Sequence, residues 1–289
     1  MLPKNKNEIK KGMVFAGCSF TWGQGLYYYS NLNTLKEPAP DTFDPTLLTR
    51  AQIKYMESVR FPRTVSRKLK SYEFVYPGNG GSNEGVVKWW ETCIYRGRYH
   101  TDVMNDYKIP IMYPSEISHF IFQFTQWNRE HVWLDDLAEG HDIEFNRVYD
   151  PAYRDLFLKK LFNEKLTIDQ FIENHIEKSF DRVKNLLTEL ESDGVKILIL
   201  TWPDEYLKYI KNDEWANDKL VHLEYKNEKY ESIHQLMNSR NPDNSLSNPE
   251  MTIKYDSDSF IDPPKDHHPS MKCHNIIAGS IIKKIEDLV

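Results

Sequence analysis

A short apolar run followed by a glycine-rich or polar loop recurs four times along the chain. The runs are MVFAG, YEFVYP, HFIFQF and VKILIL, at residues 13–17, 72–77, 119–124 and 195–200. Runs of this kind predict buried strands, and stretches with helical spacing separate them. Alternating strands and helices are typical of a parallel sheet covered by helices on both faces. We therefore expect an α/β fold, a flavodoxin-like three-layer sandwich with a central parallel sheet of about five strands.

Three helices can be placed from their periodicity and end signals. The clearest covers residues 168–194, where the apolar residues form one stripe and Gly194 suits the C-terminal cap. An earlier helix begins around Phe61, since Pro62 is favoured in a first helical turn. A last helix runs from about Ser270 to the end of the chain.

Length and composition fit one domain. The chain has 289 residues, of which 40% are hydrophobic, enough for one substantial core. Two segments, near 97–115 and 208–259, break the alternation of strands and helices, and we interpret them as insertions that could act as lids. The expectation is a single domain over residues 1–289 that carries these two insertions.

Charge and cysteine content exclude several classes of function. Acidic residues number 43 against 37 basic ones, so there is no global basic field to attract phosphate backbones, and we expect no nucleic-acid partner. Cys18, Cys93 and Cys273 lie far apart without a CxxC pair, which argues against a disulfide framework and a zinc knuckle. No apolar run reaches membrane-spanning length, and no secretory apolar region follows the charged N-terminal stretch. We expect a cytoplasmic protein without a membrane partner.

The loop FAGCSFTWGQGL places Ser19 between glycines directly after a predicted strand. A serine there can be a nucleophile, but it can also fill a tight turn or line an anion-binding loop. A nucleophile needs a base and an orienting group, and the segment DHHPS offers His268 and Asp266. Asp266, His267, His268 and His274 are alternatively candidates for metal ligands, although adjacent histidines rarely converge on one ion.

Four blocks of the chain resemble, in order, those of the SGNH, or GDSL, hydrolase family. GCSFTWG (17–23) resembles the block whose serine is the nucleophile, and NGGSN (79–83) resembles the block in which a glycine amide helps bind the oxyanion. QFTQWNR (123–129) lies where the GxND block would fall, and DHHPS (266–270) resembles the block that carries the aspartate and histidine. Together the blocks span nearly the whole chain.

The resemblance implies a serine esterase that needs neither a metal nor an organic cofactor. Ser19 would be the nucleophile, His268 the general base and Asp266 its orienting carboxylate. In addition to the Ser19 amide, the oxyanion donors would be the Gly80 amide and the side chain of Thr125 or Asn128.

The chain departs from the family pattern at three places. Cys18 replaces the usual aspartate, Thr125 stands where an asparagine is usual, and Asp266 precedes His268 by two residues where three is usual. The last two departures favour a rival interpretation, a catalytically silent virion, assembly or glycan-binding protein with the same fold. An acyltransferase is a further alternative.

Aromatic residues follow three of the predicted strands at the edge where substrate would lie. Trp22, Trp127 and Trp202 could stack on sugar rings there or pack in the core, and Arg129 could clamp an anionic group or cap a loop. This edge favours a small ester or an acylated, in particular O-acetylated, glycan over a long-chain lipid as the substrate.

The stretch GCSFTWGQGLYYYS is also similar to SGNH-type proteins of large tailed phages of marine bacteria. That resemblance implies a location in a bacterial host cell or in a virion, with virion association as an additional expectation.

Overall fold

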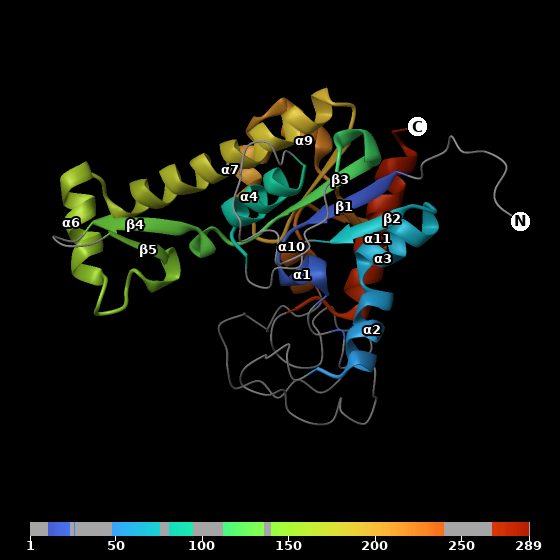
Figure 1. The fold of residues 1–289 in the computed structure, drawn as a ribbon, viewed down its shortest axis with the longest axis horizontal. Helices are drawn as coiled ribbons and strands as arrows, with labels where there is room; N and C mark the ends of the chain where they lie inside the picture. The colour runs from blue at the N-terminus through green and yellow to red at the C-terminus, as the bar shows by residue number, and fades with distance from the viewer. Residues whose placement is uncertain are drawn as a thin grey trace, which may run out of the picture.

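The computed structural model describes residues 11–23, 26, 48–75, 81–94, 112–135, 140–239 and 268–288. Of the residues expected to act, Gly80 and Asp266 lie outside this part of the chain, as does the side chain of Trp22. Figure 1 shows a central sheet between two sets of helices, with an arm extending to one side.

The centre of the molecule is a parallel sheet. Its strands are β1 (Gly12–Ala16), β2 (Tyr72–Val75), β3 (Ile117–Phe124) and β6 (Lys196–Thr201), in the order β2-β1-β3-β6. Beyond β6, Leu220 makes one isolated parallel bridge to Ile199. The described residues therefore form four strands and a bridge at the position of a fifth, where about five strands were expected. This order is the flavodoxin-like one, so the predicted α/β class is confirmed.

Two hydrophobic cores lie on opposite faces of the sheet, because successive side chains of a strand point to opposite sides. On β3, Phe120, Phe122 and Phe124 enter the first core, whereas Ile121 enters the second. The first core is covered by α4 (Asn83–Ile94), α7 (Ile168–Ser192), α8 (Leu207–Asn212) and α9 (Glu214–Lys219), and the second by α3 (Phe61–Lys68), α10 (Ile233–Asn238) and α11 (Met271–Glu286). Three layers result, as predicted (Figure 1).

The helix ends obey the expected local rules. Helix α3 begins at Phe61 with Pro62 in its first turn. Helix α11 is capped by Ser270, whose hydroxyl accepts the Cys273 N–H at 3.2 Å. Helix α7 is followed by Gly194 with φ +87°, a left-handed conformation that glycine adopts without strain.

An arm that the strand alternation did not predict extends from the body (left in Figure 1). It consists of the antiparallel strands β4 (His131–Asp135) and β5 (Gly140–Glu144), helix α6 (Arg154–Glu164) and the first turns of α7. The arm has its own small core, formed by Val132, Leu134, Ile143, Phe145, Val148, Phe157, Leu161 and Phe171. Because α7 has 25 residues, it runs from this cluster to the sheet.

The two expected insertions are only partly described. Residues 208–239 form most of α8, then α9, a hairpin of β7 (Leu223–Tyr225) and β8 (Glu228–Tyr230), and α10. Val221 and Leu223 of this stretch are buried in the second core, so it belongs to the body of the fold. Of 97–115, residues 112–115 are described and lead into β3. In the described part of the chain, no helix combines the length and apolar character needed to cross a membrane.

Candidate active site

Ser19 lies at the carboxyl edge of the sheet, at the start of the single-turn helix α1 (Ser19–Trp22) that follows β1. Gly17 precedes it where a side chain has no room: a Cβ there would lie 2.3 Å from Thr21 Oγ1. Gly23 ends the turn with φ +91° and donates its N–H to the Ser19 carbonyl at 2.9 Å. The two glycines thus hold Ser19 in a compact strand-to-helix turn.

His268 approaches Ser19 from the other end of the chain. Its Nε2 lies 2.9 Å from Ser19 Oγ, and its ring packs edge-on against Phe20 with 5.1 Å between centroids. The exposed fractions are 1% for Ser19 and 8% for His268. A neutral imidazole that accepts the serine proton at Nε2 carries its own proton on Nδ1, so the pair has the geometry of a nucleophile and its general base.

Gln123 on β3 fixes the turn that carries Ser19. Its Oε1 accepts from Thr21 Oγ1 at 2.6 Å, and its Nε2 donates to Cys18 Sγ at 3.3 Å. Both contacts are buried, where hydrogen bonds constrain geometry strongly. Gln123 was not among the residues predicted from sequence, although a polar amide within the apolar run HFIFQF indicates a buried hydrogen-bonding role.

A second buried network ties the start of α4 to the end of β3. Asn83 Oδ1 accepts the Thr125 N–H at 2.8 Å, and Asn83 Nδ2 donates to the Thr125 carbonyl at 3.3 Å and to Tyr206 Oη at 2.9 Å. The Asn83 side chain therefore pairs with both backbone groups of Thr125. Thr125 sits one residue beyond β3, at the same sheet edge as Ser19.

Glu130 joins this network through hydrogen bonds to the start of α4 and to α7. Its carboxylate accepts the N–H groups of Asn83 and Glu84, at 2.9 and 3.2 Å, and the Ser179 hydroxyl at 2.8 Å. Burial raises the pKa of the Glu130 carboxyl, and the hydrogen bonds that it accepts oppose this rise. The carboxylate thus accepts from N–H groups at the N-terminus of α4 that have no partner within the helix. The helix dipole favours an anion at this position.

The predicted substrate-binding residues separate into two groups. The Arg129 guanidinium lies 5.3 Å from the centroid of the Trp202 ring. The Trp202 ring packs on Phe20 with 4.1 Å between centroids, and Phe20 in turn contacts His268. Trp127 instead packs against Phe145 of the arm at 4.5 Å. Arg129 and Trp202 are thus joined to the Ser19–His268 pair, whereas Trp127 lies at the base of the arm.

The two candidate oxyanion side chains differ in their surroundings. Thr125 is fully buried, and its Oγ1 accepts from Arg129 Nη1 at 3.4 Å. Asn128 Oδ1 is buried and makes no hydrogen bond within the described structure. Gly80 lies outside the described residues.

His274 binds the backbone at the start of helix α3. It is fully buried, its Nδ1 accepts the Phe61 N–H at 3.2 Å, and its ring stacks on that of Phe61. Burial, aided by the charges of His268 and Arg60, lowers the pKa of His274 to about 3, so the ring is neutral at pH 7. Within the described residues, no group of three or more His, Cys, Asp or Glu side chains could hold a metal ion, and Asp266 and His267 fall outside that part.

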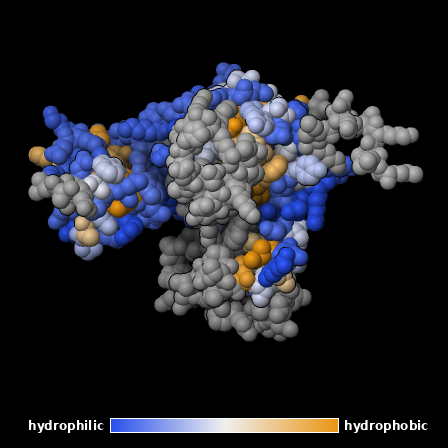
Figure 2. Space-filling view, in the orientation of Figure 1, coloured by the Kyte–Doolittle hydropathy of each residue, from blue (hydrophilic) through white to orange (hydrophobic). Residues whose placement is uncertain are grey.

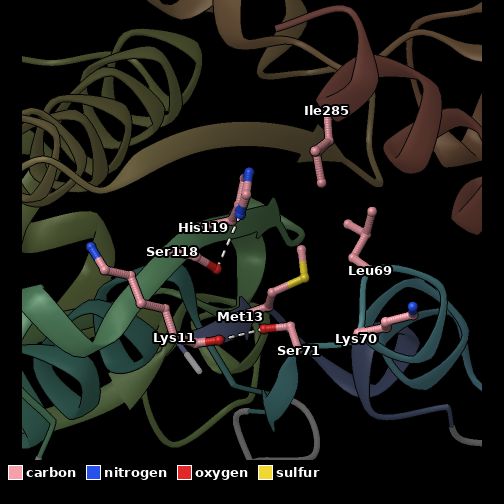
Figure 3. A pocket seen from close by; sticks show the side chains of 8 residues that line it. All are labelled: Lys11, Met13, Leu69, Lys70, Ser71, Ser118, His119 and Ile285. Carbon is pink, nitrogen blue, oxygen red and sulfur yellow. Dashed lines mark hydrogen bonds between the residues drawn. The ribbon is translucent and has the colours of Figure 1, made fainter. Parts of the chain in front are cut away.

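A cavity of about 310 Å³ lies at the opposite edge of the sheet, where the strands begin (Figure 3). Ser118 and His119 line it together, with 3.1 Å between the hydroxyl and Nδ1. The Ser118 hydroxyl donates to the Gly12 carbonyl at 3.0 Å, so its proton is not directed at His119. Burial, together with the charge of Lys196, lowers the pKa of His119 to about 4. In this second serine–histidine contact, the serine hydroxyl is therefore bound to a backbone carbonyl.

No protein-family model matches the chain, and no curated protein sequence matches it. Among solved structures, the chain is similar to an acetyl xylan esterase, Est2A, from the rumen bacterium Butyrivibrio proteoclasticus, with a TM-score of 0.49 and 13% identity over 98% of this chain and 66% of that one. It is also similar to a carbohydrate esterase family 2 enzyme with a carbohydrate-binding domain from Corynascus thermopiles (Myceliophthora fergusii), with a TM-score of 0.36 and 12% identity over 99% and 69% of the two chains. The chain thus spans just under two thirds of the first protein and slightly more than two thirds of the second.

Proposed function

We propose that the chain is an SGNH-type serine esterase that removes acyl groups, in particular acetyl groups, from a glycan or another small ester. The observation that carries the proposal is the 2.9 Å contact between Ser19 Oγ and His268 Nε2 at the carboxyl edge of the parallel sheet. Ligands of such sheets bind at this edge, outside the ends of the strands. The order of the four sequence blocks supports the same assignment.

In the proposed reaction, His268 takes the Ser19 proton while Oγ attacks the ester carbonyl. The tetrahedral intermediate collapses to an acyl-serine, and His268 returns the proton to the departing alcohol. A water molecule, deprotonated by His268, then attacks the acyl-serine and releases the carboxylic acid. Asp266 is proposed to orient His268, as the family resemblance implies.

The oxyanion would be held by the amides of Ser19 and Gly80 with the Thr125 hydroxyl or the Asn128 side chain. Thr125 Oγ1 accepts a hydrogen bond from Arg129, which leaves the hydroxyl proton for an acceptor other than that side chain. One such donor typically stabilises a transition state by about 3 kcal/mol. Gln123 and Asn83 would act as positioning residues, because they hold the Ser19 turn and Thr125.

The proposed substrate contacts are Arg129 and Trp202, together with Trp22 and Trp127. The Arg129 guanidinium lies over the Trp202 ring, which is buried in the second core against Phe20, and this supports a fixed position for Arg129 near the Ser19–His268 pair. A bacterial host or virion location remains a prediction from the resemblance to phage proteins.

A fluorophosphonate probe tests the proposal directly. Attack by Ser19 Oγ would form an O–P bond, expel fluoride and add one phosphonyl group to the intact mass. We expect one adduct on the wild-type protein and none on Ser19→Ala or His268→Ala. The matched control is Ser118→Ala, which removes the other serine that touches a histidine and should keep the adduct.

Two results would contradict the proposal. Absence of an adduct on folded wild-type protein would favour the catalytically silent binding or assembly protein. An adduct that survives in Ser19→Ala would place the nucleophile elsewhere. Release of acetate from an acetylated oligosaccharide, without any acyl acceptor, would separate hydrolysis from acyl transfer.

A further inference from the structure

The hairpin of the arm has one buried and one exposed face. Along β4, Val132 and Leu134 enter the arm core, whereas His131, Trp133 and Asp135 are exposed. On β5, Ile143 is buried and its neighbours point outward. A large aromatic residue therefore stands on the outer face of a two-stranded ribbon, with 54% of Trp133 exposed.

The Trp133 indole is held in place on this face. Its Nε1 donates to Asp135 Oδ1 at 2.7 Å. Its ring crosses diagonally to β5 and covers Gly140, where a Cβ would lie only 1.8 Å from the ring. The glycine thus provides the space in which one face of the indole rests, and the exposed fraction leaves the other side to solvent. A fixed flat ring binds a flat partner with little loss of side-chain entropy.

Carboxylate groups lie on the same outer face as the ring. Asp142 is the direct cross-strand partner of Trp133, and Glu144 is the partner of His131. His131 Nδ1 lies 3.3 Å from Asp142 Oδ1, and Asn146 Nδ2 donates to Glu144 Oε2 at 3.0 Å. Each carboxylate keeps acceptor capacity beyond these contacts, since it can take about four hydrogen bonds.

We propose that this outer face of β4–β5 binds a neutral pyranose sugar, whose flat C–H face stacks on Trp133 and whose hydroxyl groups donate to the adjoining carboxylates of Asp135 and Asp142. The carboxylates disfavour uronates, sulfated sugars and nucleic acids, because each would bring negative charge against them. A purely apolar protein partner would leave the same carboxylates buried without partners. Sugar hydroxyls satisfy them.

The proposal deepens the proposed function, on which it rests for the identity of the ligand as part of a glycan substrate. The arm projects from the body that carries α1 (Figure 1), so a sugar on Trp133 would be a remote unit of a chain whose acylated unit lies at Ser19. Figure 2 shows the arm as a mainly hydrophilic surface with scattered hydrophobic residues.

Affinity electrophoresis tests the proposal separately from catalysis. The Ser19→Ala protein would be run in native gels that contain deacetylated xylan, galactomannan or hydroxyethylcellulose as neutral probes, and polygalacturonate as the anionic probe. We expect retardation by at least one neutral glycan and not by polygalacturonate. Trp133→Ala should weaken the binding by about tenfold or more, because one ring face loses its apolar contact.

Two further variants make the result specific. Gly140→Ala should displace the indole and weaken binding without removing it. Phe162→Ala removes another exposed aromatic residue of the arm, 83% exposed and on α6, and should leave binding unchanged. Circular dichroism of each variant would establish that the arm is folded.

Absence of retardation by all three neutral glycans would overturn the proposal, and so would equal losses in Trp133→Ala and Phe162→Ala. Neither outcome depends on Ser19, since the protein tested lacks the nucleophile. Binding to neutral glycans together with a failed fluorophosphonate test would leave this sugar site standing and reject only the esterase.

Discussion

A side chain at position 17 would collide with the turn that carries Ser19. The added Cβ would lie 2.3 Å from Thr21 Oγ1 and 2.9 Å from Gln123 Cβ. We expect Gly17→Ala to lower the free energy of unfolding by about 1–3 kcal/mol, as overpacking does, and to slow the proposed ester hydrolysis by roughly tenfold or more. Urea unfolding and initial rates measure both effects.

Gly279 provides the matched control for this substitution. It is exposed within α11, and a Cβ there would meet no atom within 4 Å. Gly279→Ala should therefore raise the free energy of unfolding by about 0.5–1 kcal/mol through helix propensity alone. Equal stability of Gly17→Ala and wild type would mean that the turn that carries Ser19 can accept a side chain at position 17.

His274 makes the free energy of unfolding depend on pH. Burial lowers its pKa from the ordinary value of 6.5 to about 3, so between these values the unfolded chain binds a proton that the folded chain does not. Stability must then fall as the pH falls from 6.5 towards 3, by about 1.4 kcal/mol per pH unit from this residue once the unfolded histidine is protonated. His274→Gln should flatten the profile from urea unfolding at pH 4, 5, 6 and 7. Parallel wild-type and variant profiles would contradict the assignment.

At the scale of elements, helix α4 depends on a carboxylate from outside the helix. Glu130→Leu would leave the N–H groups of Asn83 and Glu84 and the Ser179 hydroxyl without their acceptor. We expect a loss of about 3 kcal/mol or more in the free energy of unfolding, measured with urea. Glu84→Gln is the control: its half-exposed carboxylate pairs with Lys88 and should contribute less than about 1 kcal/mol. Comparable losses in both variants would deny Glu130 its capping role.

Elements with strong periodicity and clear end signals were predictable from sequence. The runs of the sheet strands, the stripe of α7 with Gly194 and the start of α3 at Phe61 all follow local rules. The β4–β5 hairpin was not predicted, although HVWLD alternates as a half-buried strand should. Helix α6 offers a weaker signal, because only Phe157 and Leu161 of its residues are buried.

The residues of the candidate site that could be predicted are those that stand in a recognisable sequence motif. Ser19 and His268 stand in such motifs, and the structure brings them together. A second network joins residues that are far apart in the chain, namely Asn83, Glu130 and Tyr206. Local sequence patterns do not predict such pairings. Long-range polar contacts are therefore the part of the site that sequence reasoning missed.

For the whole molecule, we expect the arm to unfold locally at a lower free energy than the central sheet. Its core is a small separate cluster, whereas the sheet is enclosed by two larger ones. Native-state hydrogen exchange should show β4 and β5 amides exchanging through openings of lower free energy than those of β1 and β3. Equal protection of the four strands would indicate that arm and body unfold as one cooperative unit.

The contact between Ser19 and His268 joins the first strand-to-helix turn to the last helix of the described chain. During synthesis Ser19 is made 249 residues before His268, and the part of a nascent chain that is made first is available to fold first. A nascent chain in which the sheet strands have emerged would still hold an unactivated serine. The proposed esterase would therefore stay inactive until His268 has been made and α11 has packed against the sheet.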